Sequence, residues 1–129
     1  MKKTDNGEVN PGKIFDTCFA FATSRILLSG VELEIFTHIA NGHRTMLDIA
    51  RAAQADSRGI EALLNSLVAM NFLTKSNNLY DLTPPAKKFL VKGLPTYYGD
   101  FVLHIDLLWE SWKNLTKVIS TGKSYLSVD

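Results

Sequence analysis

Apolar side chains recur at steps of three and four residues from position 13 to position 29, which predicts a helix over this range. Ile14, Phe21 and Leu28 lie off the main stripe. The apolar surface is therefore wider than one core-facing stripe requires. Gly30 is expected to end the helix, because glycine is a poor helix former.

Start and stop signals for short helices fill the middle of the chain. Residues 31–40 are expected to form a second helix that ends at Asn41 and Gly42. Thr45, followed three residues later by Asp48, resembles a capping box and begins a helix that runs to about residue 53. A short turn then leads into the next helical segment.

A further helix and a β-hairpin follow this turn. Residues 58–70 have a helical apolar period, and either Asp56 or Ser57 is expected to cap the helix. Two short apolar segments, 72–75 and 79–82, flank Ser-Asn-Asn and predict a hairpin.

Thr83 is expected to cap a last short helix, with Pro84 at its first position and Gly93 at its end. Helix, turn, helix, hairpin, helix is the order of a winged helix-turn-helix. The expected fold class is therefore mainly α, with a three-helix core, a small β-hairpin and additional long helices at both ends.

The second of these long helices is predicted over residues 99–121, with a length of about 30 Å. Val102, Leu103, Trp109 and Val118 add apolar surface outside its main stripe. The two terminal helices either pack against each other or are buried between two copies, and burial between copies is favoured. The candidate dimer-interface residues are Phe15, Phe19, Phe21, Leu108 and Trp112.

Composition and charge describe a globular chain. The 129 residues are 46% hydrophobic and carry a formal net charge of +1. Residues 43–93 hold 7 basic and 4 acidic residues, but the exposed side of the helix expected over 58–70 sets Arg58 beside Glu61 and alanines. DNA is disfavoured as a partner, because phosphate binding needs several cations that converge on one face.

Cysteine usage and targeting signals point to the cytoplasm. Cys18 is the single cysteine, so the chain has no internal disulfide, and it is expected to be a small core residue. No uninterrupted apolar run reaches 18 residues, and residues 1–13 lack the apolar segment of a secretory signal. We therefore expect no membrane partner.

Residues for catalysis or metal binding are sparse. No two of the eight glycines are two apart, so the chain has no Gly-x-Gly phosphate loop. His38 and His43 are five apart, outside the spacing that puts two metal ligands on one helix face. His104 lies on an apolar stripe near Asp106 and Glu110, and is either a core or interface histidine or a polar group in an aromatic pocket. We expect no metal and no catalytic residue.

Several segments, in order, resemble the N-terminal region of S-adenosylmethionine (SAM)-dependent small-molecule O-methyltransferases. Tyr80-Asp-Leu-Thr-Pro84 is similar to a Tyr-x-Leu-Thr-Pro motif of that family, and the resemblance covers roughly residues 14–123. The other similar segments are Ala22 to Phe36, Thr45 to Ala50, Asp56 to Leu73, and Trp109 to Lys123.

The resemblance implies a winged-helix dimerisation domain over residues 13–123, preceded by a frayed segment 1–12 and followed at 124–129 by the start of a linker. In that family a C-terminal Rossmann-like domain binds SAM and transfers the methyl group. The N-terminal helices interlock with a partner subunit and help line the acceptor pocket. The resemblance thus implies a homodimer, a small-molecule acceptor, and Phe101, His104 and Trp109 as pocket residues.

The acidic-x-Gly-x-Gly loop that would bind the methyl donor does not occur in these residues. We therefore expect this chain to bind no SAM itself, and its parent protein to be the enzyme. The alternative is a stand-alone winged-helix transcriptional regulator that binds DNA or an aromatic ligand, as the net +3 charge of residues 43–93 would allow.

Overall fold

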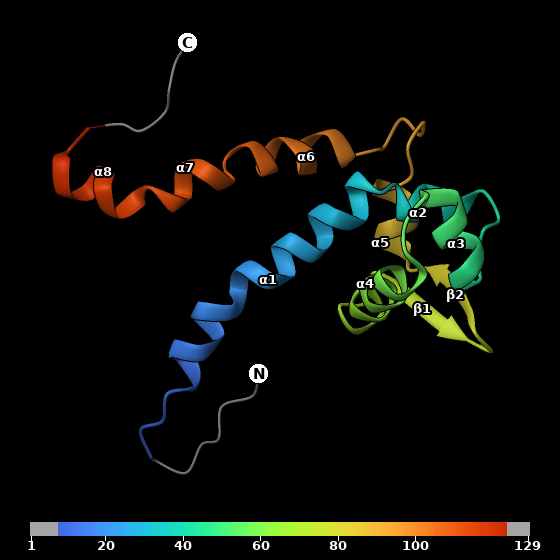
Figure 1. Ribbon diagram of the computed structural model, residues 1–129, viewed down its shortest axis with the longest axis horizontal. Coiled ribbons are helices and arrows are strands. Elements are labelled where there is room, and N and C mark those ends of the chain that lie inside the picture. Colours follow the sequence, from blue (N-terminus) through green and yellow to red (C-terminus); the bar gives the residue numbers. More distant parts are fainter. Residues whose placement is uncertain (1–7, 124–129) are drawn as a thin grey trace.

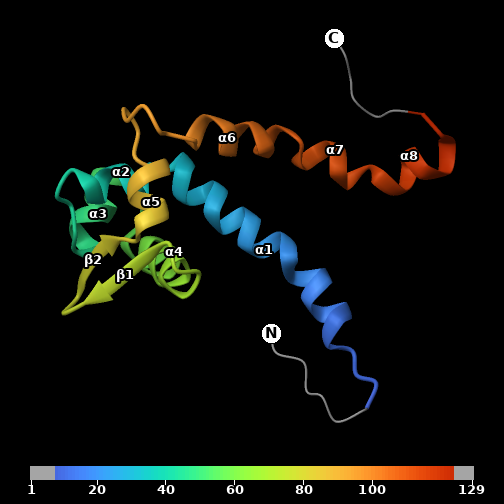
Figure 2. The ribbon, with the colours of Figure 1, turned by 180° about the vertical axis from the view of Figure 1, so that it is seen from behind.

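A computed structural model describes residues 8–123 as a small lobe from which two helical arms diverge (Figures 1 and 2). One arm is α1, and the other is the run from α6 to α8. The helices are α1 (Gly12–Glu32), α2 (Ile35–Ala40), α3 (Met46–Ala53), α4 (Ser57–Ala69), α5 (Pro84–Phe89), α6 (Gly99–Leu107), α7 (Trp109–Lys113) and α8 (Leu115–Thr121). The strands are β1 (Leu73–Ser76) and β2 (Leu79–Leu82), which pair antiparallel.

The described part is thus mainly helical with one two-stranded sheet, as the sequence predicts. Residues 8–11 precede the first helix and are exposed. Gly12, the last residue of the segment expected to be frayed, is the first residue of α1, and residues 1–7 of that segment lie outside the described residues. So does the expected linker at 124–129.

The core lies in the lobe, where the inner end of α1 meets α2, α3, α4, α5 and the hairpin. Two helix caps fix its local geometry. The Thr45 hydroxyl accepts a hydrogen bond from the Asp48 amide at 3.2 Å, and the Asp56 carboxylate accepts one from the Gly59 amide at 2.9 Å. Both caps confirm the sequence prediction, with Asp56 rather than Ser57 as the cap of α4. The largest fully buried side chains are Ile35, Phe36, Ile49, Ile60, Leu64, Leu67, Leu73 and Tyr80.

The hairpin turns through Asn77 and Asn78, both with positive φ, as a two-residue β-hairpin loop requires. Ser76, which the sequence prediction placed in the turn, is instead the last residue of β1 and pairs with Leu79. Its strands are joined to the helices by polar contacts. The Tyr80 hydroxyl donates to the Asn65 side chain at 2.9 Å, and the Tyr80 amide donates to the Arg44 carbonyl at 2.8 Å. Arg44 also pairs with Asp81.

Gly30 does not end the first helix, contrary to the sequence prediction. The helix continues to Glu32, and the chain turns at Glu34, which has a φ of 55°. Gly30 is buried, and a Cβ there would lie 3.3 Å from side-chain atoms of Leu67 and Phe36. The glycine therefore serves close helix packing, and that packing offsets its low helix propensity.

The helix after the hairpin is shorter than predicted, and its cap differs. It ends at Phe89 rather than Gly93, which lies in the following loop with a φ of +96°. The Thr83 hydroxyl makes no cap hydrogen bond and donates instead to the Phe72 carbonyl at 3.0 Å. Thr83 thus holds the end of the hairpin against its start.

The predicted continuous helix over 99–121 is three short helices, interrupted at Leu108 and Asn114. At each break an amide donates to the carbonyl three residues earlier: Leu108 to Ile105 at 3.0 Å, and Asn114 to Ser111 at 3.1 Å. These tighter bonds shift the direction of the helix. The Asn114 side chain also donates to the Glu110 carbonyl at 3.1 Å, so it competes with the regular backbone pattern.

Candidate functional site

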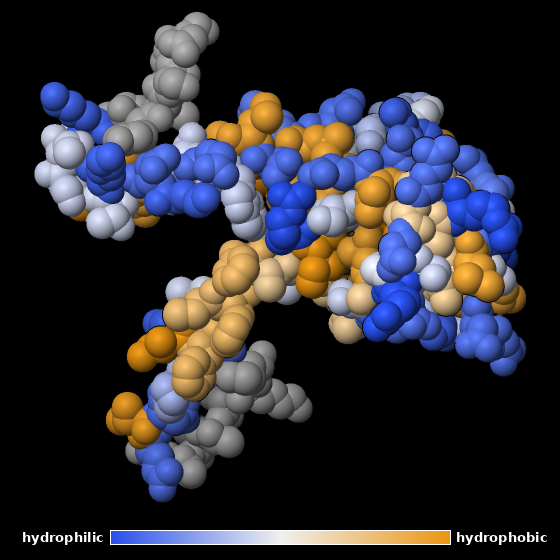
Figure 3. Space-filling view, in the orientation of Figure 1, coloured by the Kyte–Doolittle hydropathy of each residue, from blue (hydrophilic) through white to orange (hydrophobic). Residues whose placement is uncertain are grey.

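The outer two-thirds of α1 exposes an apolar surface that makes few contacts with the rest of the chain. Phe15, Phe19 and Phe21 are all more than half exposed, as is Ile14. Figure 3 shows apolar residues along much of this arm. Only Leu28, Gly30 and Val31, at the inner end of the helix, are buried. The wide apolar surface predicted for this helix is therefore present, and most of it faces outward.

Cys18 lies on this exposed part of α1 and is a free thiol. The expectation that it is a core residue is wrong for this chain. A small side chain with apolar neighbours suits a buried subunit interface as well as a domain core. Sequence periodicity does not distinguish a residue of an interface from a residue of the core.

The second arm has the same character. Phe101, Leu107, Trp112 and Ile119 are each more than 60% exposed, whereas Leu108 is half-buried at the first break. The two arms touch where α6 passes the inner part of α1, and then separate (Figure 1). Packing of the arms against each other within the chain therefore leaves most of their apolar surface uncovered.

Arg25 of α1 joins the two arms where they begin to diverge. Its guanidinium donates to Asp106 at 2.6 Å and to Glu32 at 2.6 Å, and it lies 5.5 Å from the ring centre of Trp109. The hydrogen bond with Glu32, together with that to Asp106, raises the pKa of Arg25 against the opposing effect of burial. The sequence analysis did not single out Arg25, although it is the lone cation between Lys13 and the end of α1.

The start of α6 is fixed to the lobe. The Tyr98 amide donates to the Phe89 carbonyl at 2.7 Å, and the two rings are stacked with centres 5.4 Å apart. The Tyr97 ring occupies the space beside Gly99 where a side chain would lie. Burial raises the pKa of Tyr97, and the charges of Asp100 and Glu34 add to the rise. The second arm thus leaves the lobe from a defined anchor.

The three candidate pocket residues all lie on the second arm, but no described cavity contains them. Phe101 and His104 are exposed on α6, so His104 is not a core residue within this chain. Trp109 is half-buried beneath Arg25. Each of the three would need atoms from outside residues 8–123 to become part of an enclosed site.

The two described cavities lie elsewhere. One, of about 200 Å³, opens between α3, α4 and the hairpin. The other is an open depression on the outer end of α1, lined by Lys13, Ile14, Thr17 and Cys18. Among the described residues no cluster of three or more His, Cys, Asp or Glu side chains could hold a metal ion. The remaining feature with functional potential is the apolar surface of the two arms.

The helix and hairpin that would face DNA in a winged helix are largely engaged in internal contacts. Asn65 accepts a hydrogen bond from Tyr80, Lys75 lies 5.2 Å from the ring centre of Tyr80, and Arg44 is paired with Asp81. Glu61 shares the rim of the 200 Å³ cavity with Lys75. This surface offers few cations that converge on one face.

By length and composition, α1 could also cross a membrane, and it is the one helix within residues 8–123 that could. The sequence expectation counted only uninterrupted apolar runs and did not anticipate this. The inner end of α1 is part of the lobe core, however, and Arg25 makes ion pairs with two acidic residues. These features suit a helix packed against protein.

Comparison with known proteins assigns the family. The profile of the O-methyltransferase dimerisation domain matches residues 15–92. The tetracenomycin polyketide synthesis 8-O-methyl transferase TcmO of Streptomyces glaucescens is 32% identical over 115 residues, which are 88% of this chain and 34% of TcmO. The SAM-dependent methyl transferase PigF of a Serratia strain is 31% identical over 100 residues, 77% of this chain and 29% of PigF.

Solved structures of methyltransferases share the fold of this chain. The structure of PigF with SAH matches with a TM-score of 0.82 at 23% identity, over 88% of this chain and 38% of that one. Human N-acetylserotonin methyltransferase in complex with SAM has a TM-score of 0.81 at 20% identity, over 93% of this chain and 37% of that one, which shows a shared fold. This chain thus spans about a third of the length of these relatives. It belongs to the O-methyltransferase dimerisation domain family.

Proposed function

We propose that this chain forms a homodimer through its two arms and that it is the dimerisation and acceptor-pocket-lining part of a SAM-dependent small-molecule O-methyltransferase. The observation that carries the proposal is the row of exposed Phe15, Phe19 and Phe21 on a helix whose inner end is built into the core. Full burial of one phenylalanine side chain contributes about 1.5–3 kcal/mol. A second copy can supply that cover with the same residues.

The core of the lobe is proposed to be a winged helix-turn-helix. Support comes from the order α3, turn, α4, hairpin, α5 and from the cap of each helix in the pair. The hydrogen bond from the Tyr80 amide to the Arg44 carbonyl adds a strand-like contact at the edge of β2. The domain is proposed to extend over 13–123, with the linker to a catalytic domain beginning at 124–129.

The residues described here do not fit SAM. A nucleotide site of the Rossmann type uses closely spaced glycines after a strand and a nearby carboxylate for the ribose. The described sheet is a single hairpin that turns through two asparagines, and its neighbouring cavity is lined by one acid and no glycine. Methyl donor binding is therefore proposed to belong to a catalytic domain of the parent protein. The relatives are biosynthetic methyltransferases, which supports the proposal that this protein acts in the cytoplasm.

Phe101, His104 and Trp109 are proposed to line the acceptor pocket together with atoms outside this chain. Their support is position: an exposed aromatic ring and an exposed imidazole lie on one helix, at the start of the second arm. The full-length enzyme with His104→Ala should then have an altered KM for its acceptor and unchanged dimerisation. Loss of the dimer would instead make His104 an interface residue.

The dimer itself is tested by sedimentation equilibrium of this 129-residue chain from about 1 to 100 µM, because interfaces of standard size have micromolar or tighter affinities. We expect the mass of a dimer at the upper concentrations. A strictly monomeric chain over the whole range would refute homodimerisation through these arms.

A further inference from the structure

Arg25 of α1 contacts the second arm on both sides of the break at Leu108, which separates α6 from α7. Leu108 interrupts the second arm, with Asp106 on its α6 side and Trp109 at the start of α7. The guanidinium donates to the Asp106 carboxylate at 2.6 Å and lies 5.5 Å from the ring centre of Trp109. One side chain of α1 therefore contacts the arm just before and just after it changes direction.

The contact is partly shielded from solvent and involves a second carboxylate. The Arg25 side chain is 37% exposed and that of Asp106 32% exposed, so solvent screens the pair only in part. Glu32 lies about two turns further along α1. Its carboxylate accepts a hydrogen bond from the other terminal nitrogen of the Arg25 guanidinium at 2.6 Å and thereby orients the guanidinium. A planar guanidinium can serve two carboxylates and an aromatic face at once, which an ammonium group cannot.

Because of its position, this contact can affect the direction of α7 and α8. The stacking of Tyr98 on the ring of Phe89 fixes the start of α6, and the packing of α6 against α1 is the main contact between the two arms. Beyond Trp109, both arms diverge with their apolar residues exposed (Figure 1). A change of direction at Leu108 would therefore move α7 and α8 relative to the outer end of α1.

From these observations we infer that Arg25 is a positioning residue: it bridges the break at Leu108, through Asp106 and Trp109, and so sets the angle between the two arms. This inference rests on the proposed function only for its consequence, which is that the arms are held at the spacing that a second copy must fit. Holding them so before association lowers the ordering cost of dimerisation.

The angle is measurable within one chain. Cys18 is the single cysteine and is exposed on α1, and Ser120→Cys adds a second label site on α8. Spin labels at these two sites report the distance between the arms by pulsed dipolar spectroscopy. The measurement is made on dilute, monomeric chain, because Cys18 lies on the part of α1 that the proposed dimer would cover.

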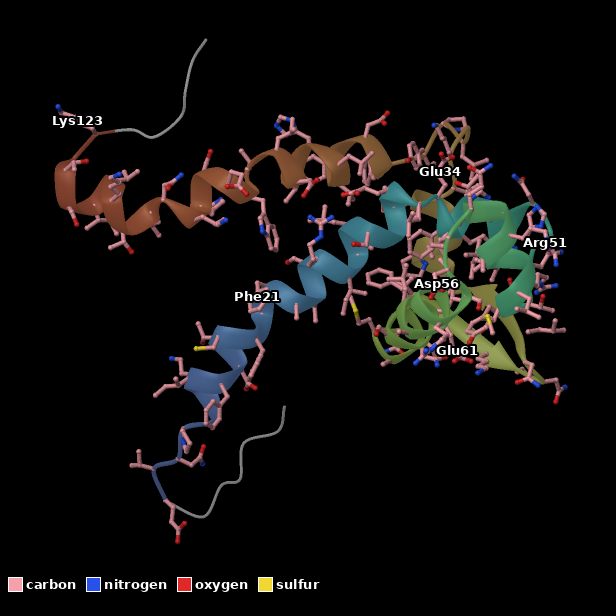
Figure 4. All side chains as sticks on the ribbon, in the orientation of Figure 1. Phe21, Glu34, Arg51, Asp56, Glu61 and Lys123 are labelled. Atoms are coloured by element: carbon pink, nitrogen blue, oxygen red, sulfur yellow. The ribbon has the colours of Figure 1, made fainter. Side chains whose placement is uncertain are left out.

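We expect one narrow distance distribution for the doubly labelled chain and a broad or displaced one for Arg25→Met, which keeps the apolar stem and loses the charge. Arg25→Lys should be intermediate, and Asp106→Asn should resemble Arg25→Met. The matched control is Arg51→Met, since Arg51 is exposed on α3, on the side of the lobe away from both arms (Figure 4). Its distribution should be unchanged.

Dimerisation provides the second readout. If the arms are held by Arg25, Arg25→Met should weaken the dimer by about three- to tenfold, the effect of one partly buried charged network. An Arg25→Met distribution identical to that of the unsubstituted chain would overturn the inference. If Arg25→Met fails to fold, Asp106→Asn carries the same test. A monomeric unsubstituted chain would refute the proposed function, while the distance comparison would still decide the role of Arg25.

Discussion

At the scale of single residues, Gly30 shows how a residue type can have two opposite meanings. In the sequence a glycine after an apolar stretch indicates a helix end, and that prediction is wrong here. The structure shows instead that the missing side chain leaves room for Leu67 and Phe36. Local sequence cannot separate the two cases, because the deciding neighbours come from other parts of the chain.

Substitution of Gly30 should therefore be costly despite the better helix propensity of the replacement. Gly30→Val is expected to lower the free energy of unfolding by about 1–3 kcal/mol, since its branched side chain would overpack the contact with Leu67 and Phe36. Urea unfolding at fixed protein concentration measures this. Gly59→Val is the matched control, because a Cβ there meets only the Asp56 carboxylate at an ordinary 3.7 Å. Equal effects at both positions would contradict the packing argument.

At the scale of secondary structure, the caps of α3 and α4 and the turn of the hairpin could be predicted because each depends on neighbouring residues. Thr45, Asp56 and the Asn77-Asn78 pair act within three residues of their own position. The breaks at Leu108 and Asn114 could not, since the apolar period runs through both without interruption.

The sequence left open whether Asp56 or Ser57 caps α4, and the structure allows a test that distinguishes the two residues. Asp56→Ala should lower the free energy of unfolding by about 1 kcal/mol, because the Gly59 amide loses its partner. Ser57→Ala should be close to neutral, as Ser57 is the first helical residue and not the cap. Thermal unfolding followed by circular dichroism compares the two. A larger loss for Ser57→Ala would move the cap to that residue.

At the scale of the whole molecule, the excess apolar surface of the two terminal helices could be predicted from the sequence, but the arrangement of these helices in space could not. Periodicity alone showed that both terminal helices carry more apolar surface than one packed face needs. That the arms diverge depends on the anchor at Tyr98 and the contact of Arg25 with Asp106, which join residues far apart in the sequence. For the same reason Phe101, His104 and Trp109 could be named as candidates but not brought together within this chain.

The divergent arms lead to a prediction about where a second copy binds. Phe19 on α1 and Leu47 on α3 are similarly exposed apolar residues, at 65% and 60%, but only Phe19 lies on an arm. Phe19→Asp should convert the dimer to a monomer in sedimentation experiments, because a carboxylate buried in an apolar interface has no partner. Leu47→Asp should leave the dimer intact, and both variants should keep the helical circular dichroism of the parent chain. A dimer disrupted by Leu47→Asp and not by Phe19→Asp would place the interface on the lobe, where α3 and the hairpin border the 200 Å³ cavity.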